Sequence, residues 1–186
     1  MVKQKEIWFI INPKSGGKNK AYLPGLIDAH IDKNKFNISL KFTSFAGEAT
    51  IIAEKAVDAK IDIVCAVGGD GTINEIAQAL VNSNTALAVL PMGSGNGLAR
   101  HLNIPLNTKK ALLKINHLTT NKIDVGYINS YFFVGTCGFG FDAHVAYLFD
   151  NSKKGDLLTT PRLPFQKFRL ILVLQSNWRM KSIPTA

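Results

Sequence analysis

The sequence predicts an α/β fold, in which a layered parallel sheet carries helices on both faces and is followed by a second, β-rich unit. Short apolar segments alternate with segments of helical periodicity up to about residue 120, and three loops of small residues each directly follow an apolar segment. Repeated strand, loop and helix units of this length are typical of parallel strands covered by helices.

The first strand and helix units occupy the region up to residue 59. Ile7–Ile11 is an apolar run that predicts a buried strand ending at Asn12-Pro13, and residues 22–31 space their apolar side chains like a helix face. Residues 36–42 alternate apolar and polar side chains, as a strand with one buried face does. Residues 49–59 place their apolar side chains on one helical stripe, which predicts the second helix.

Two further units follow. Residues 61–67 form a continuous apolar strand that ends in a glycine-rich loop, and residues 72–81 read as the helix behind it. Residues 86–90 predict another buried strand, followed by a glycine-rich turn and a short helix. In such sheets ligands bind at the carboxyl ends of the strands, and all three loops fall at that edge.

The pattern changes after about Asp124. Residues 124–128 and 131–137 flank a two-residue connection without a helix, which predicts a β-hairpin. We therefore predict two domains: residues 1–122 form an α/β domain, and residues 123–186 form a β-rich domain.

Composition and charge narrow the function classes. Hydrophobic residues make up 46% and charged residues 19% of the 186 residues, a balance typical of globular proteins. The net charge of +9 favours anionic partners, which leaves nucleic acid, nucleotide phosphates and anionic lipid headgroups open; a solvated basic surface explains the charge equally well. Cys65 and Cys137 lie in apolar runs and are predicted to be core residues. Without a secretory signal or an apolar span, we expect a cytoplasmic protein.

Three loops carry the candidate chemistry: the first loop, Asn12–Gly17; the second loop, Gly68–Thr72; and the third loop, Gly93–Gly97. Glycines let a backbone approach a ligand closely and turn its amide groups inward, so such loops can bind phosphate. Helix starts behind the second and third loops add a favourable dipole. A single glycine-rich turn is a weak signal, but three at one sheet edge predict a phosphate site. None of these loops fits the Walker pattern, and the dinucleotide fingerprint is absent from the first strand-to-helix turn, which disfavours NAD binding of the usual kind.

Asp70 is the most informative residue of the second loop. A carboxylate between glycines at the end of a buried strand suits a magnesium ion beside phosphates, although a cap or turn aspartate explains the spacing equally well. Thr72 can bond phosphate, and Glu75 could orient the loop or complement the helix dipole.

Five ordered motifs then define a resemblance: NPKSGG at 12–17, T-x-x-x-G-E-A at 43–49, GGDGTINE at 68–75, PMGSGN at 91–96 and GFGFDA at 138–143. Together they resemble the diacylglycerol kinase catalytic domain family, which includes bacterial lipid kinases and the sphingosine and ceramide kinases. NAD kinases share a related GGDG loop, but the Asn-Pro and Gly-Ser-Gly-Asn loops together are not expected in them.

The resemblance implies that residues 1–122 bind the nucleotide and that residues 123–186 are an incomplete β-sandwich domain for a lipid substrate. ATP is then expected to bind between the two domains and to pass its γ-phosphate to a lipid hydroxyl. It assigns Asp70 to magnesium and to catalysis, Asp124 to catalysis, and Asp142 to the lipid headgroup, although a turn aspartate explains Asp142 equally well. It implies nucleotide contacts at Asn12, Pro13, Lys14, Ser15, Gly16, Thr43, Gly68, Gly69, Asp70, Gly71, Thr72, Ile73, Asn74, Glu75, Gly93, Ser94, Gly95 and Asn96.

One departure concerns the third loop, which continues as Asn96-Gly97 where many bacterial members have Asn-Asp. The small residue resembles the sphingosine kinase version and leaves the lipid undecided.

We expect an ATP- and Mg2+-dependent lipid kinase that meets a diacylglycerol- or sphingosine-like substrate at a membrane surface through peripheral contact, with no nucleic-acid partner. Because family members continue beyond this length and supply a late glutamate as base, we also expect impaired activity and a tendency to form homo-oligomers. The rival hypotheses are an NAD kinase-like enzyme for a soluble metabolite and a non-catalytic nucleotide-binding remnant.

Overall fold

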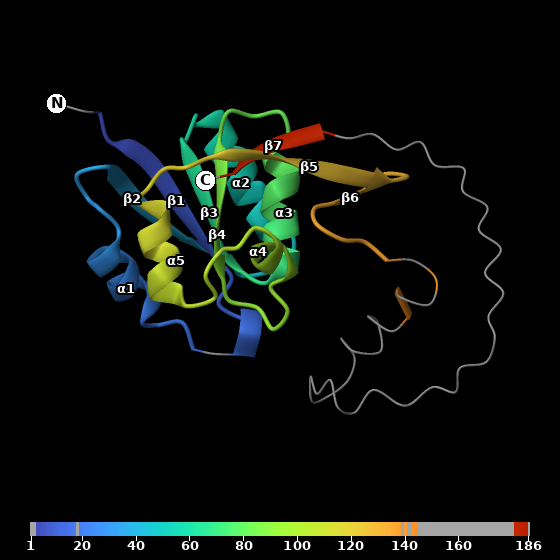
Figure 1. Ribbon diagram of the computed structural model, residues 1–186, viewed down its shortest axis with the longest axis horizontal. Coiled ribbons are helices and arrows are strands. Elements are labelled where there is room, and N and C mark those ends of the chain that lie inside the picture. Colours follow the sequence, from blue (N-terminus) through green and yellow to red (C-terminus); the bar gives the residue numbers. More distant parts are fainter. Residues whose placement is uncertain (1–2, 18, 139, 141–142, 145–180, 186) are drawn as a thin grey trace. The chain divides into compact units, whose positions relative to one another are not determined.

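The computed structural model describes residues 3–17, 19–138, 140, 143–144 and 181–185 (Figure 1). The chain divides into two compact units, one of residues 1–135 with 178–186 and one of residues 136–177, and most of the second lies outside the described residues. The elements below belong to the first unit.

Four parallel strands form the centre of the sheet, in the order β2-β1-β3-β4. Ile7 of β1 lies opposite Ile38 of β2 on one side and Ile63 of β3 on the other. The predicted parallel α/β fold is therefore confirmed, with strand bounds close to those expected. The strands are β1 (Lys5–Ile11), β2 (Phe36–Phe42), β3 (Ile63–Gly68) and β4 (Ala86–Pro91).

Three further strands extend the sheet beyond β4. They are β7 (Lys181–Thr185), β5 (Asn121–Ile128) and β6 (Tyr131–Phe133), in that spatial order. β7 runs parallel to β4, with Thr185 opposite Leu87, and antiparallel to β5. β5 and β6 form the predicted hairpin around Asn129, whose φ of 54° suits a tight two-residue turn.

Helices cover both faces of the sheet (Figure 1). One face packs against α1 (Leu23–His30) and α5 (Thr108–Ile115), and the other against α2 (Glu48–Asp58), α3 (Asp70–Leu80) and α4 (Gly97–His101). α5 was not predicted from the sequence; its buried residues Ala111, Leu112 and Ile115 lie on one side of the helix. In the described part of the chain, no helix has the length and apolar character to cross a bilayer.

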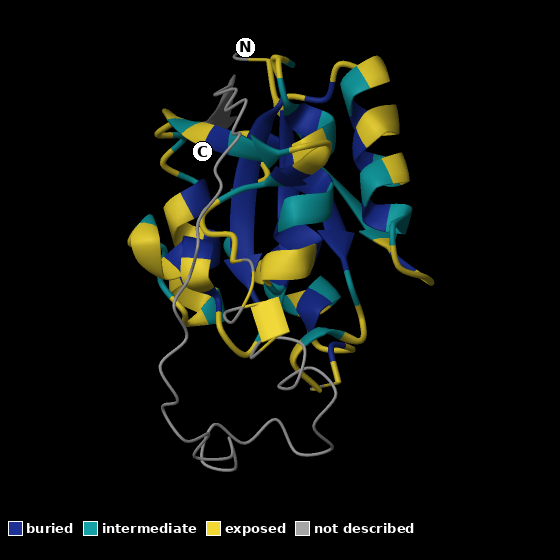
Figure 2. Cartoon of the chain, turned by 90° about the vertical axis from the view of Figure 1, so that its right-hand side faces the viewer, coloured by how far each residue is buried: buried dark blue, intermediate teal, exposed yellow. Residues whose placement is uncertain are grey.

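Side chains of the central strands alternate strictly between the two helical layers. Phe9 and Cys65 pack toward α1 and α5, whereas Ile10, Val64 and Ala66 pack toward α2 and α3. Figure 2 shows the resulting buried central strands beneath helices whose outward sides are exposed. Burying a large aliphatic or aromatic side chain contributes about 1.5–3 kcal/mol, so the doubly covered strands form a rigid base for the loops at their carboxyl ends.

The first compact unit continues to Gly135, past the boundary predicted after residue 122, because β5, β6 and β7 belong to it. The lipid-substrate domain predicted for 123–186 stays a prediction, since most of 136–177 lies outside the described residues. Cys65 is buried as expected, and burial raises the pKa of its thiol. The prediction for Cys137 is wrong: this side chain is exposed, because the strand before it already ends at Phe133.

Candidate functional site

Asn12, directly after β1, organises the first loop. Its backbone N–H donates to the Val67 carbonyl oxygen at 3.0 Å, which ties the end of β1 to β3. Its side-chain Oδ1 accepts from the Lys14 N–H at 2.9 Å, and its carbonyl oxygen accepts from the Ser15 hydroxyl at 3.1 Å. An asparagine that bonds the backbone two residues on builds a tight turn, so this residue shapes the loop from within.

The buried side chain of Lys20 binds the backbone of the first loop. Its side chain is only 4% exposed, and its Nζ donates to the carbonyl oxygens of Pro13, at 3.3 Å, and Ser15. Burial lowers the pKa of this ammonium group. Lys20 was not predicted as a site residue, because a lysine in a polar stretch of sequence is normally exposed on the surface.

The three loops meet through their glycines. A Cβ on Gly16, whose φ is +65°, would lie 2.1 Å from the Met92 carbonyl oxygen, just before the third loop. A Cβ on Gly93 would lie 2.5 Å from the Cα of Gly69 in the second loop. No side chain fits at either contact, so glycine is required there by close backbone approach.

The contact between the first two loops lies at the point where the strand order reverses. From β1 the chain passes to β2 on one side and then returns to β3 on the other. Open α/β sheets bind ligands in the crevice at such a switch point. The Asn12 side chain crosses it, since its Nδ2 donates to Oγ1 of the buried Thr72 at 3.1 Å.

A cavity of about 260 Å³ opens at this edge. It brings together five residues of the predicted nucleotide set, from the loop after β1, the loop after β2 and α3. Phe45, whose side chain is 59% exposed, also lines it and was not predicted. The lining residues are Asn12, Lys14, Thr43, Ser44, Phe45, Ala46, Ala49, Thr72 and Glu75.

Asp70 of the second loop faces the third loop and the start of α4. It is the first residue of α3, it is exposed, and its Oδ1 accepts from the Leu98 N–H at 3.3 Å. A Cβ on Gly95 would lie 3.3 Å from its other oxygen, Oδ2. The carboxylate thus joins α3 to the start of α4 while remaining open to solvent.

Asn96 closes the third loop on itself. Its side chain accepts from the Gly93 N–H and donates to the Gly93 carbonyl oxygen, both at 2.8 Å. The residue has a left-handed backbone, with φ 53°, and is 7% exposed. Asn96 therefore shapes the loop, whereas Ser94 lies at its exposed tip and has an accessible hydroxyl.

The remaining predicted contacts of the second motif differ in what they can offer a ligand. Ile73 is fully buried in the core, so only its backbone is available. Asn74 faces β6: its Oδ1 accepts from the Val134 N–H at 3.0 Å and its Nδ2 donates to the Phe132 carbonyl oxygen at 3.4 Å. Gly71 has open space beside its Cα, and Gly68 packs against the Thr72 side chain.

Two further carboxylates, Asp124 and Asp142, belong to the predicted site. Asp124 lies exposed on β5, opposite Ser182 of β7, and no hydrogen bond or ion pair within the described ranges joins its side chain to the loops. Asp142 lies outside the described residues. Their assigned roles stay predictions.

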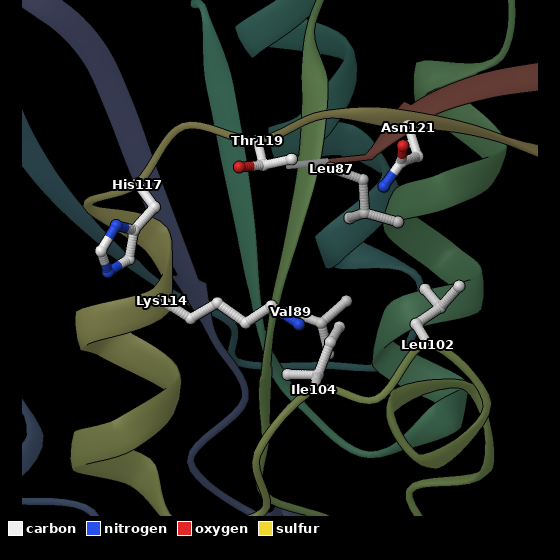
Figure 3. A pocket seen from close by; sticks show the side chains of 8 residues that line it. All are labelled: Leu87, Val89, Leu102, Ile104, Lys114, His117, Thr119 and Asn121. Atoms are coloured by element: carbon white, nitrogen blue, oxygen red, sulfur yellow. The ribbon is translucent and has the colours of Figure 1, made fainter.

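A second cavity, of about 370 Å³, lies beside β4 and shares no residue with the first (Figure 3). Lys114 extends from α5 toward Val89 and Ile104, and its Nζ donates to the Asn103 carbonyl oxygen at 3.1 Å. The lining residues are Leu87, Val89, Leu102, Ile104, Lys114, His117, Thr119 and Asn121. None of them belongs to the predicted site.

Comparison with known proteins gives a family match over most of the described fold. The model of the diacylglycerol kinase catalytic domain matches residues 6–128. A diacylglycerol kinase of Staphylococcus epidermidis is 32% identical over 147 residues, which cover 77% of this chain and 46% of that protein. One of Staphylococcus aureus is 33% identical, with the same coverage of both proteins.

A solved structure agrees with this match. The crystal structure of a diacylglycerol kinase from Bacillus anthracis is similar with a TM-score of 0.60 and 27% identity, covering 72% of this chain and 49% of that one. The present chain therefore spans about half the length of the relatives that it matches.

Proposed function

This chain belongs to the diacylglycerol kinase catalytic domain family, and we propose that it binds ATP at its three loops and catalyses transfer of the γ-phosphate to a lipid hydroxyl. The observation that carries the proposal is the convergence of the three loops at the carboxyl edge of the strands, beside the switch point, where their glycines allow close backbone contact between loops. Backbone amides at such places bind phosphate.

The residues present fit a nucleotide. Lys14 supplies a positive charge at the cavity, and Thr43 and Thr72 supply hydroxyl groups. Phe45 offers an exposed ring, whose apolar face suits a purine base. The cavity of about 260 Å³ is slightly smaller than the roughly 300–1,000 Å³ of ordinary small-molecule sites, so we assign it part of the nucleotide and assign the phosphates to the adjoining loops.

Asp70 fits a magnesium ion that is shared with phosphate. Over the described part of the chain, no three His, Cys, Asp or Glu side chains gather as a metal site. Magnesium is commonly bound by one or two carboxylates, with water and substrate phosphates completing its shell. Asp70 would therefore hold the ion through its exposed oxygen, and the bound ion would neutralise charge on the phosphates.

The protein's part in the reaction is then mostly positioning. Phosphoryl transfer requires little covalent chemistry from the enzyme. The loop amides and Lys14 would hold the phosphates and spread their charge, while Asp124 would face the acceptor. The acceptor, a diacylglycerol- or sphingosine-like lipid, is met at a membrane surface through peripheral contact, and no nucleic acid takes part.

Two measurements on the purified chain test the proposal. Calorimetric titration with MgATP should give saturable binding of one nucleotide. Incubation with radiolabelled ATP and either diacylglycerol-containing vesicles or NAD, followed by thin-layer separation, should label the lipid and not NAD. Labelled NAD would indicate the soluble-metabolite kinase instead, and binding without transfer to any acceptor would indicate a non-catalytic protein. Absence of ATP binding would refute the nucleotide site itself.

A further inference from the structure

The outward side of α5 combines lysines with exposed leucines. Lys109 and Lys110 are exposed, and Leu113 is 43% exposed. Leu106, immediately before the helix cap, is 41% exposed. We propose that these four residues, here called the docking face, are the surface by which the chain docks on an anionic membrane. This inference rests on the proposed function, in which the phosphate acceptor is a membrane lipid.

The geometry of α5 separates this face from the core. Ala111, Leu112 and Ile115 are buried against the sheet, and at 3.6 residues per turn Lys109 and Leu113 fall on the opposite side. The Asn107 side chain caps the helix by accepting from the Lys110 N–H at 3.0 Å. The helix is thus anchored on one side and capped, which leaves the docking face presented on a fixed support.

Charge around the docking face favours an anionic surface. The sequence from Ile76 to Ile123 contains no Asp or Glu, whereas it contains Arg100, Lys109, Lys110, Lys114 and Lys122. The acids of the neighbouring α1 region are already paired, Asp28 with Lys33 at 2.6 Å and Asp32 with Lys35 at 3.9 Å. α5 itself contains no Asp or Glu, so no carboxylate of this helix repels an anionic headgroup.

The mixture of side chains favours a lipid bilayer over nucleic acid. Lysine beside leucine is the composition of surfaces that lie in the headgroup region, where the charge attracts anionic lipids and the apolar chain inserts. Nucleic-acid affinity comes chiefly from phosphate contacts made by lysine and arginine, which an exposed leucine does not supply. The two leucines therefore provide the discriminating test.

The docking face also begins next to the nucleotide loops. The Thr108 hydroxyl, at the first residue of α5, lies 3.8 Å from the sulfur of Met92. The Met92 carbonyl oxygen in turn lies against Gly16 of the first loop. A membrane bound at α5 would therefore lie near the phosphoryl donor, as transfer to a membrane lipid requires.

Vesicle co-sedimentation of the whole chain tests the docking face. We expect binding to vesicles of phosphatidylcholine with phosphatidylserine, much weaker binding to phosphatidylcholine alone, and weakening by added salt.

Since a lysine near an anionic surface contributes about fivefold in binding, Lys109→Gln with Lys110→Gln should weaken vesicle binding about thirtyfold. Lys55→Gln with Lys60→Gln, the same charge change at exposed positions in and just after α2, should leave more than half of the binding. Leu106→Ser with Leu113→Ser should weaken vesicle binding although it leaves the charge of the docking face unchanged.

Equal losses from the α2-region and α5 lysine variants would overturn the docking face, because only the net charge would then matter. Vesicle binding that survives the leucine variant unchanged would overturn it in favour of a purely electrostatic surface, such as one for nucleic acid. MgATP titration of the same variants should be unaffected. Loss of ATP binding in the unaltered chain would instead refute the proposed nucleotide site and leave the vesicle results intact.

Discussion

Replacing Gly16 by alanine should separate the role of this glycine in the ligand site from its backbone conformation, because its neighbour offers a matched control. Gly16 and Gly17 have φ values of +65° and +63°, so an alanine at either position costs about 1–2 kcal/mol in the left-handed region. A Cβ on Gly17 meets nothing within 4 Å, whereas a Cβ on Gly16 would lie 2.1 Å from the Met92 carbonyl oxygen.

That contact lies about 1.3 Å inside the 3.4 Å at which ordinary van der Waals contact begins, so the first loop must move away from the third. A loop displaced by this distance should lose at least one backbone hydrogen bond to phosphate. A hydrogen bond to a charged group contributes about 1.5–3 kcal/mol, which corresponds to a roughly 10- to 150-fold weaker Kd. We expect that loss for Gly16→Ala and less than a fivefold change for Gly17→Ala.

Calorimetric titration with MgATP measures the affinities, and thermal unfolding followed by circular dichroism measures the shared conformational cost. Both variants should have a lowered Tm, with the nucleotide loss confined to Gly16→Ala. Equal affinities in the two variants would refute the reasoning, because the contact between the first and third loops would then not shape the phosphate site.

Three further changes test other parts of the site. Asp70→Asn keeps the side-chain shape and can still accept from the Leu98 N–H, so we expect a normal Tm. Nucleotide binding should be at least tenfold weaker in the presence of Mg2+ and little changed in its absence. Equal losses with and without Mg2+ would contradict the metal assignment. Lys20→Met removes the ammonium group that binds the first loop, and it should weaken binding of ATP and of inorganic triphosphate about tenfold or more. Lys20→Arg should partly rescue this binding. Unchanged triphosphate binding would show that Lys20 only fills space. Asn74→Ala leaves the Val134 N–H without its partner, so hydrogen exchange around β6 should accelerate and stability should fall by about 1–3 kcal/mol, whereas a large loss of ATP affinity at unchanged stability would favour direct nucleotide contact.

Much of the fold follows from local periodicity. The strands near Ile7, Ile63 and Ala86 are apolar on both faces, which only a sheet covered by helices on both sides satisfies, and strict alternation marked residues 36–42 as a strand. Local signals failed where partners far along the chain decide the structure. β7 exists through pairing with β5 and β4, and α5 through burial of Ala111, Leu112 and Ile115 against the sheet. Asp70 was expected on a loop, whereas the structure places it as the first residue of α3.

The sequence by itself determined the α/β class, the three glycine-rich loops and their position at one sheet edge, because repeated strand and helix units imply parallel strands and the loop chemistry is encoded within a few residues. Only the tertiary structure decided which atoms meet there. It placed the Gly16 backbone against Met92, the Asp70 carboxylate against the start of α4, Asn74 against β6, and Lys20 beneath the first loop. These contacts join residues from different elements, and the packing of helices on the sheet sets their distances, which no local pattern of residues specifies.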